Sequence, residues 1–190
     1  MTKIYVTDCS TLMDVNILTS ALIHLKPARL NKINSLKTPE CKAQTAAAGL
    51  LLHHCFGPNH SIKAAKYGKL YLEDRTAYFS ISHSDQWVAL AVAEQEIGFD
   101  LQVLSPIRPL VLHRYFNENE QIYIGDDDTR FTEIWTQHEA YTKYLGTPIT
   151  TAHVPDRSLP HCSGRYQNTI YTLYGDDKLE IFPVNIKDLL

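Results

Sequence analysis

Two short segments of the sequence carry side chains that could hold a metal ion and a phosphate group. Residues 79–84 read Phe-Ser-Ile-Ser-His-Ser, and an acid, Asp100, follows on a later apolar stretch. Residues 135–143 read Trp-Thr-Gln-His-Glu-Ala-Tyr-Thr-Lys, which supplies Glu139 and Lys143. Oxygen ligands suit a hard cation such as Mg²⁺, which binds one or two carboxylates together with waters and phosphate oxygens. The two segments therefore predict a divalent cation that clamps a diphosphate.

The elements that must position these side chains are a strand and a helix. Asp100 and Gln102 are two residues apart on a predicted strand over residues 97–103, so both side chains point to one face. Glu139 and Lys143 are four residues apart on a predicted helix that ends near Leu145, so they share one stripe with Trp135. If the strand packs against the helix, the two acids converge on one ion, with the amide oxygen of Gln102 beside them.

Simpler interpretations of the same residues remain open on spacing alone. Glu139 and Lys143 could be an ordinary surface pair, worth a few tenths of a kcal/mol. Trp135 could be a core residue, and His83 could end its strand without any part in binding. Asp100, which follows a glycine, could simply be a turn residue. Spacing by itself does not decide the function.

Composition and charge exclude several classes of protein. The chain has 190 residues, enough for one sizeable core or two small halves. Its net charge of −3 argues against a protein that coats nucleic acid. No run of 18 apolar residues occurs, so no membrane span is expected. The N-terminus lacks the pattern of a signal peptide, and the four scattered cysteines indicate reduced thiols, so a cytoplasmic protein is expected.

The order of predicted elements indicates an α+β fold. Strands are expected at residues 3–7, 79–83, 87–93 and 97–103, and a hairpin is expected to pair 166–173 with 178–184. Helices are expected at residues 11–25, 38–56 and 129–145, the last with Thr129 as its N-cap, and a basic connector is expected at 26–37. Runs of helices and runs of strands do not alternate as they do in a doubly wound sheet. We expect two similar lobes related by a pseudo-twofold axis, residues 1–97 and residues 98–190, each with an antiparallel sheet packed on helices.

Taken together, the motifs resemble those of the 4′-phosphopantetheinyl transferases. Residues 79–84 resemble the family's F-N-I-S-H-S, residues 97–102 its G-I-D-I-E, and residues 135–143 its W-S/T-x-K-E-A/S-x-x-K. Residues 67–69 resemble the start of Y-G-K-P, and residues 114–116, with Glu120 following, are similar to R-F-F…E. The match runs in family order from about residue 29 to about residue 150. It is closer to the longer, monomeric, two-lobed type that activates peptide and polyketide synthetases than to the short trimeric type.

The resemblance implies transfer of phosphopantetheine from coenzyme A to a serine of an apo acyl or peptidyl carrier protein, with release of 3′,5′-adenosine bisphosphate. Such a reaction uses Mg²⁺, or Mn²⁺ in its place, to neutralise charge on the diphosphate. It implies Asp100, Gln102 and Glu139 as metal ligands, with Glu139 also helping to deprotonate the serine. Asp100, Glu139 and Lys143 would form the catalytic set. The residues implied for coenzyme A are Arg29, Lys32, Lys69, Ser82, His83, His138 and Lys143.

Three positions depart from the family pattern. The third acid is Gln102, whose amide brings no charge and should weaken metal binding. The lysine of the helix motif is His138, which is only partly charged at neutral pH. Leu70 replaces a proline. The alternatives are therefore a degenerate homologue that binds a carrier protein or coenzyme A without transfer, and an unrelated metal-dependent phosphate enzyme. The resemblance identifies neither the carrier protein nor the role of Glu120.

Overall fold

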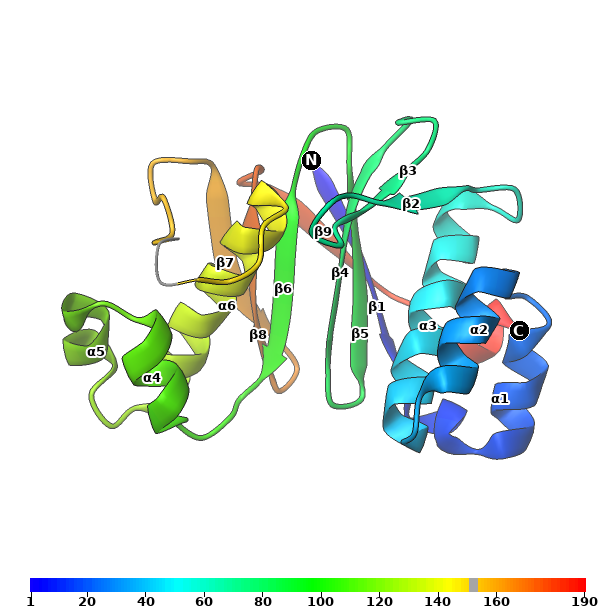
Figure 1. Ribbon diagram of the computed structural model, residues 1–190, viewed down its shortest axis with the longest axis horizontal. Coiled ribbons are helices and arrows are strands. Elements are labelled where there is room, and N and C mark those ends of the chain that lie inside the picture. Colours follow the sequence, from blue (N-terminus) through cyan, green and yellow to red (C-terminus); the bar gives the residue numbers. More distant parts are fainter. Residues whose placement is uncertain (151–153) are drawn as a thin grey trace.

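The computed structural model describes residues 1–150 and 154–190 of the chain. Two sheets lie at the centre, and helices flank them on both sides (Figure 1). The larger sheet has the order β4 (Tyr78–Ser84), β5 (Trp87–Ala93), β1 (Thr2–Asp8) and β9 (Leu179–Pro183). The smaller sheet has the order β6 (Gly98–Val103), β8 (Thr169–Tyr174) and β7 (His161–Tyr166), and a small hairpin pairs β2 (Ile62–Ala64) with β3 (Leu70–Leu72). The predicted α+β class is confirmed.

Each main sheet has helices of its own. Alongside the larger sheet lie α1 (Val15–Leu22), α2 (Pro27–Ser35) and α3 (Pro39–Phe56), with the short helices η1 (Ser10–Met13) and η2 (Ile186–Leu189). Alongside the smaller sheet lie α4 (Pro109–Tyr115), α5 (Glu118–Ile124) and α6 (Asp128–Leu145). Within the described ranges, no helix combines the length and the apolar character needed to cross a membrane.

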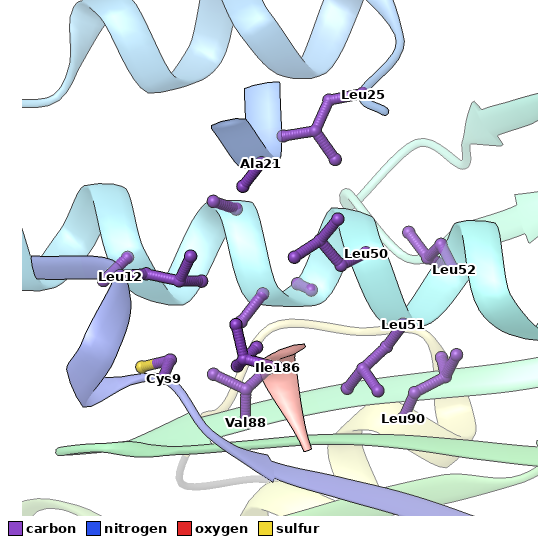
Figure 2. Packing of buried hydrophobic residues seen from close by; sticks show 14 of the residues in the cluster. Cys9, Leu12, Ala21, Leu25, Leu50, Leu51, Leu52, Val88, Leu90 and Ile186 are labelled. Carbon is purple, nitrogen blue, oxygen red and sulfur yellow. The ribbon is translucent and has the colours of Figure 1, made fainter. Parts of the chain in front are cut away.

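Helix α3 forms because its sequence signals agree with its packing. The side chain of Thr38 caps the first turn by accepting from the backbone nitrogen of Cys41 at 3.2 Å, and a proline opens the helix. The leucines at residues 50–52 belong to one buried cluster with Val88 and Leu90 of β5 and Ile186 of η2, and Leu51 points toward Leu90 (Figure 2). This core fixes α3 against the larger sheet.

A second apolar cluster joins the two sheets to each other. Ile4 of β1 and Ala89 and Ala91 of β5 pack there with Phe99 and Leu101 of β6. The main sheets therefore share a core, and the strand that carries Asp100 is held between the larger sheet and α6.

The structure corrects four expectations. The basic connector is helix α2, which Pro27 starts at its first position. The cap of α6 is Asp127, whose side chain accepts from two backbone nitrogens, and not Thr129. The expected hairpin is wrong because β8 pairs with β7, while β9 returns to β1 as a parallel neighbour. The larger sheet is therefore mixed at its edge and not purely antiparallel. The division at residues 97 and 98 stays a proposal, with β9 and η2 packed on the N-terminal sheet.

Candidate active site

Three alternate serines of β4 attach β6 to the larger sheet. Ser80, Ser82 and Ser84 accept hydrogen bonds from the backbone nitrogens of Phe99, Leu101 and Val103, at 3.0, 3.2 and 3.0 Å. These hydroxyls satisfy backbone donors that would otherwise be buried at the edge of β6. Because the serines occupy every second position, their spacing fixes the register of β6 against β4. We call residues 80, 82 and 84 the serine ladder.

The ladder places Ser82 directly against Asp100. The hydroxyl of Ser82 donates to Oδ1 of Asp100 at 2.6 Å, and Nζ of Lys143 contacts the same oxygen at 2.6 Å. Lys143 also donates to the Ser82 hydroxyl at 3.1 Å. The other carboxylate oxygen of Asp100, Oδ2, is buried and has no hydrogen-bond partner among the described residues. An acceptor left open in this way is suited to an external ligand.

Gly98 allows α6 to lie close against β6. A Cβ atom at this position would lie 2.0 Å from the carbonyl oxygen of Ala140 and 2.2 Å from the backbone nitrogen of Tyr144. Both atoms belong to the α6 backbone and cannot rotate away. The glycine of the strand motif is therefore required by the close approach that brings Asp100 to Lys143.

Glu139 lies in the same electrostatic environment. Burial raises its pKa above the ordinary glutamate value, and the negative charge of Asp100 raises it further, whereas Lys143, Arg108 and His138 act in the opposite direction. A bound divalent cation would relieve the unfavourable effect of the Asp100 charge on ionisation of Glu139. Both acids come from the C-terminal half, on β6 and α6, and the N-terminal half contributes Ser82.

These residues have the chemistry that a hard divalent cation needs. Asp100 offers an unpartnered oxygen, Glu139 a carboxylate whose charge is disfavoured, and Gln102 an amide on the same face of β6. Across the part of the chain that is described, no cluster of three or more His, Cys, Asp or Glu side chains is placed to hold a metal. Two carboxylates with one amide form an open set, which leaves positions for water and phosphate.

His83 links this centre to α2. Burial lowers the pKa of His83, the charges of Lys143 and Lys32 lower it further, and Asp100 opposes them. The imidazole is therefore neutral at pH 7 and can donate one ring N–H to a phosphate oxygen. The charges of Lys32 on α2 and of Lys143 on α6 both act on this imidazole.

Arg29 and Lys32 line a cavity of about 520 Å³ between α2, α3 and β2. Its other basic or titratable lining side chains are His24, Lys26, His60 and Lys63. The described lining contains no acid, and burial lowers the pKa of Arg29. The cavity therefore has the character of an anion site.

Lys69 has a different environment from the other predicted cations. Its Nζ donates to the carbonyl oxygens of Ile97 and Tyr144 at 3.1 and 3.0 Å, and it forms an ion pair with Glu96 at 2.5 Å. Lys69 thus ties the turn before β3 to the start of β6 and the end of α6. Its stem lines a cavity of about 270 Å³ together with Tyr67, Lys143 and other residues at the C-terminal end of α6.

His138 points to another part of the molecule. Its Nε2 lies 2.9 Å from Oε1 of Glu120, and its side chain is 1% exposed. Burial alone would raise the pKa of Glu120, but the hydrogen bond to His138 lowers it below the ordinary value. Glu120 also closes the capping box of α5 by accepting from the backbone nitrogen of Asn117 at 3.0 Å. The pairing of Glu120 with His138 was not predicted, although both residues stand in motifs.

Comparison with known proteins agrees with this geometry. Residues 96–181 match the family model described as the 4′-phosphopantetheinyl transferase superfamily. The 4′-phosphopantetheinyl transferase gsp of Aneurinibacillus migulanus is 32% identical over 132 residues, which cover 66% of this chain and 54% of gsp. The 4′-phosphopantetheinyl transferase Sfp of Bacillus subtilis strain 168 is 33% identical over 91 residues, which cover 45% of this chain and 41% of Sfp.

A third relative has the same name. The 4′-phosphopantetheinyl transferase psf-1 of Bacillus pumilus is 31% identical over 78 residues, which cover 38% of this chain and 34% of psf-1. The chain matches about half the length of gsp and less of the other two. The relatives support the expected type, that of gsp and Sfp, and the matched family model includes both Asp100 and Glu139. The chain is therefore similar to the 4′-phosphopantetheinyl transferase superfamily, over residues 96–181 in the family model and over 66% of its length in the match to gsp.

Proposed function

We propose that this protein transfers the 4′-phosphopantetheine arm of coenzyme A to a serine of an apo acyl or peptidyl carrier protein. The observation that carries the proposal is the open Oδ2 of Asp100 in the same electrostatic environment as Glu139. The serine oxygen of the carrier attacks the β-phosphorus of coenzyme A. The bond from that phosphorus to the bridging oxygen breaks, and 3′,5′-adenosine bisphosphate leaves with the electron pair.

Asp100, Glu139 and Gln102 would hold the Mg²⁺ or Mn²⁺ ion. When bound, such an ion neutralises charge that develops on the diphosphate. Lys143 holds Oδ1 of Asp100 and leaves Oδ2 available to the ion. The raised pKa of Glu139 also suits a base that accepts the serine proton, directly or through a water molecule.

The remaining cations would bind coenzyme A. His83 donates to a phosphate oxygen, and Lys143 balances the charge next to it. Arg29 and Lys32 bind a phosphate of the nucleotide end in the basic cavity, which lies near His83 through Lys32. Lys69 forms one wall of the cavity at the end of α6, and Ser82 acts by fixing Asp100.

We propose an indirect role for His138. A side chain that is 1% exposed and paired with Glu120 affects coenzyme A through the position of the next residue, Glu139. The partners of the protein in this proposal are coenzyme A and the carrier protein, and the working unit is a monomer in the cytoplasm.

The test is a mass measurement of the carrier. Purified protein, coenzyme A, Mg²⁺ and an apo carrier protein are mixed, and the carrier is weighed by mass spectrometry. We expect the mass to increase by one phosphopantetheine arm, and we expect no increase with Asp100→Asn or with EDTA. Binding of coenzyme A without any gain in mass, across several carriers and metal concentrations, would support the degenerate homologue instead.

A further inference from the structure

The loop before α4 places Arg108 at the edge of the candidate active site. This cation lies outside the motifs identified in the sequence. Arg108 is exposed, and its guanidinium lies over the ring of Trp135 at 5.1 Å and over that of Phe131 at 5.7 Å. Trp135 is one helical turn before Glu139 on the stripe of α6 that faces the site. Arg108 therefore lies next to the acidic centre, on the side opposite Lys143.

The loop that carries Arg108 is fixed along α6. The backbone nitrogen of Ile107 donates to Oδ1 of Asp128 at 2.8 Å, and that of Ser105 donates to the hydroxyl of Thr132 at 3.3 Å. Both acceptors belong to the first turns of α6. The backbone on either side of Pro106 is thus held before any ligand binds, and this sets the position from which the Arg108 side chain reaches Trp135.

Arg108 has an uncommitted charge. No described acid forms an ion pair with its guanidinium, whereas Lys143 and Lys69 are each paired with a carboxylate. His138, which stands where the family motif has a lysine, is buried against Glu120 and offers no cation at the surface.

The direction of α6 indicates which part of coenzyme A lies near Arg108. The proposed function places the nucleotide end at Arg29 and Lys32, and the charges of Lys32 and Lys143 both act on His83, so the nucleotide end lies on the Lys143 side of the stripe. Successive members of the stripe rise by about 6 Å along the helix. A diphosphate that starts at Lys143 and passes Glu139 therefore extends toward Trp135 with its pantetheine-bearing phosphate.

We propose that Arg108 contacts the phosphate that is transferred, and that it offers this phosphate an exposed cation where His138, buried against Glu120, cannot reach a ligand. The inference rests on the proposed function. The group to be recognised is the β-phosphate of coenzyme A, which 3′,5′-adenosine bisphosphate lacks. A planar guanidinium suits this contact because it presents several N–H donors to phosphate oxygens.

The test compares two ligands by isothermal titration calorimetry, with and without Mg²⁺. Arg108→Ala should weaken binding of coenzyme A by about tenfold, the loss expected for a hydrogen bond to a charged group. Its affinity for 3′,5′-adenosine bisphosphate should stay within about twofold of that of the unmodified protein, a difference near the size of surface effects. Arg108→Lys should recover part of the affinity for coenzyme A.

The matched control is Arg114→Ala, which removes an equal charge from a ring-stacked arginine on α4. It should leave the affinities for both ligands unchanged. If Arg108→Ala weakened the binding of both ligands equally, the inference would be overturned. It would also be overturned if the variant only raised the Michaelis constant for the carrier protein. Absence of transfer by the unmodified protein would overturn the proposed function. The ratio of the affinities for coenzyme A and for 3′,5′-adenosine bisphosphate would still test the role of Arg108.

Discussion

Lys143 contacts one oxygen of Asp100, Oδ1, at 2.6 Å and leaves the other, Oδ2, buried without a partner. The two oxygens of a single carboxylate thus have different environments. The first is held by Lys143 and Ser82, which orient the side chain. The second is free to ligate a cation. An ordinary structural ion pair in the same place would be expected to satisfy both oxygens, because a buried acceptor without a partner costs stability.

Two variants of the serine ladder should distinguish an effect on folding stability from an effect on metal binding. Ser80→Ala and Ser82→Ala each remove a hydroxyl that serves a backbone donor of β6, and each should lower the free energy of unfolding by about 1–3 kcal/mol. Only Ser82 also holds Asp100. We expect Ser82→Ala to weaken Mn²⁺ binding by about tenfold, as is typical when a residue that orients a ligand is lost, and Ser80→Ala to leave it unchanged. Urea denaturation and metal titration measure the two effects. Equal metal affinities in the two variants would contradict this account of Ser82.

Gly98 should be far less tolerant of a methyl group than Gly164. In Gly98→Ala the new Cβ meets the backbone of α6 at 2.0 and 2.2 Å, so the helix must move away from β6, at a cost of about 3 kcal/mol or more. In Gly164→Ala the contact is with the end of the Tyr171 side chain at 2.5 Å, which can move. Thermal unfolding of the two variants provides the measurement. A smaller loss of stability in Gly98→Ala than in Gly164→Ala would show that the approach of β6 to α6 is looser than described.

Gln102→Glu should strengthen metal binding. The substitution adds a third carboxylate on the face of β6 that carries Asp100, so the dissociation constant for Mg²⁺ should fall by about tenfold through added ligand charge. Without metal, the third negative charge should lower the melting temperature. A melting temperature that rises without metal, or a metal affinity that is unchanged, would place Gln102 outside the site. The control is Glu133→Gln, which alters a carboxylate of α6 outside the proposed metal site.

The pKa of Glu139 predicts how stability depends on pH in the metal-free protein. Because the folded-state pKa is raised above 4.5, the native state binds more protons than the unfolded state between these two values. The contribution of Glu139 to stability therefore falls as the pH rises through that window. Glu139→Gln, which stays neutral, should be more stable than the unmodified protein at pH 7 and should lose this advantage below about pH 4.5.

Chemical denaturation across this pH range measures the effect, with Glu133→Gln as the control, since its carboxylate is 34% exposed on the same helix. The same Glu139→Gln change should abolish transfer to the carrier protein. A variant that is less stable at pH 7 than the unmodified protein would mean that the Glu139 carboxylate is satisfied by partners other than a metal ion.

The parts of the fold with strong local signals could be predicted from the sequence. Helix α3 has a threonine cap, a first-turn proline and a terminal glycine, and the strands around residues 79–103 alternate or run apolar in the expected way. The return of β9 to β1 could not be predicted, because a parallel pairing between distant segments leaves no local signal. Helix α2 was missed because its basic residues suggested a connector.

For the site, the motifs predicted which residues gather but not how they pair. The structure pairs Asp100 with Ser82 and Lys143, whereas the spacing on strand and helix indicated only that Asp100 and Glu139 could converge on one ion. The pairing of His138 with Glu120 depends on how α5 packs against α6, and the placement of Arg108 depends on a loop fixed by backbone hydrogen bonds. Neither follows from the periodicity of an element, so only the structure shows them.

The most direct test of the central claim is Mn²⁺ binding followed by electron paramagnetic resonance, without coenzyme A or carrier. The claim is that Asp100 and Glu139 share one divalent cation. The account predicts one Mn²⁺ per chain in the unmodified protein, displaced by Mg²⁺, and loss of that binding in both Asp100→Asn and Glu139→Gln while Glu133→Gln retains it. Retention of tight, stoichiometric Mn²⁺ binding by either of the first two variants would contradict the account.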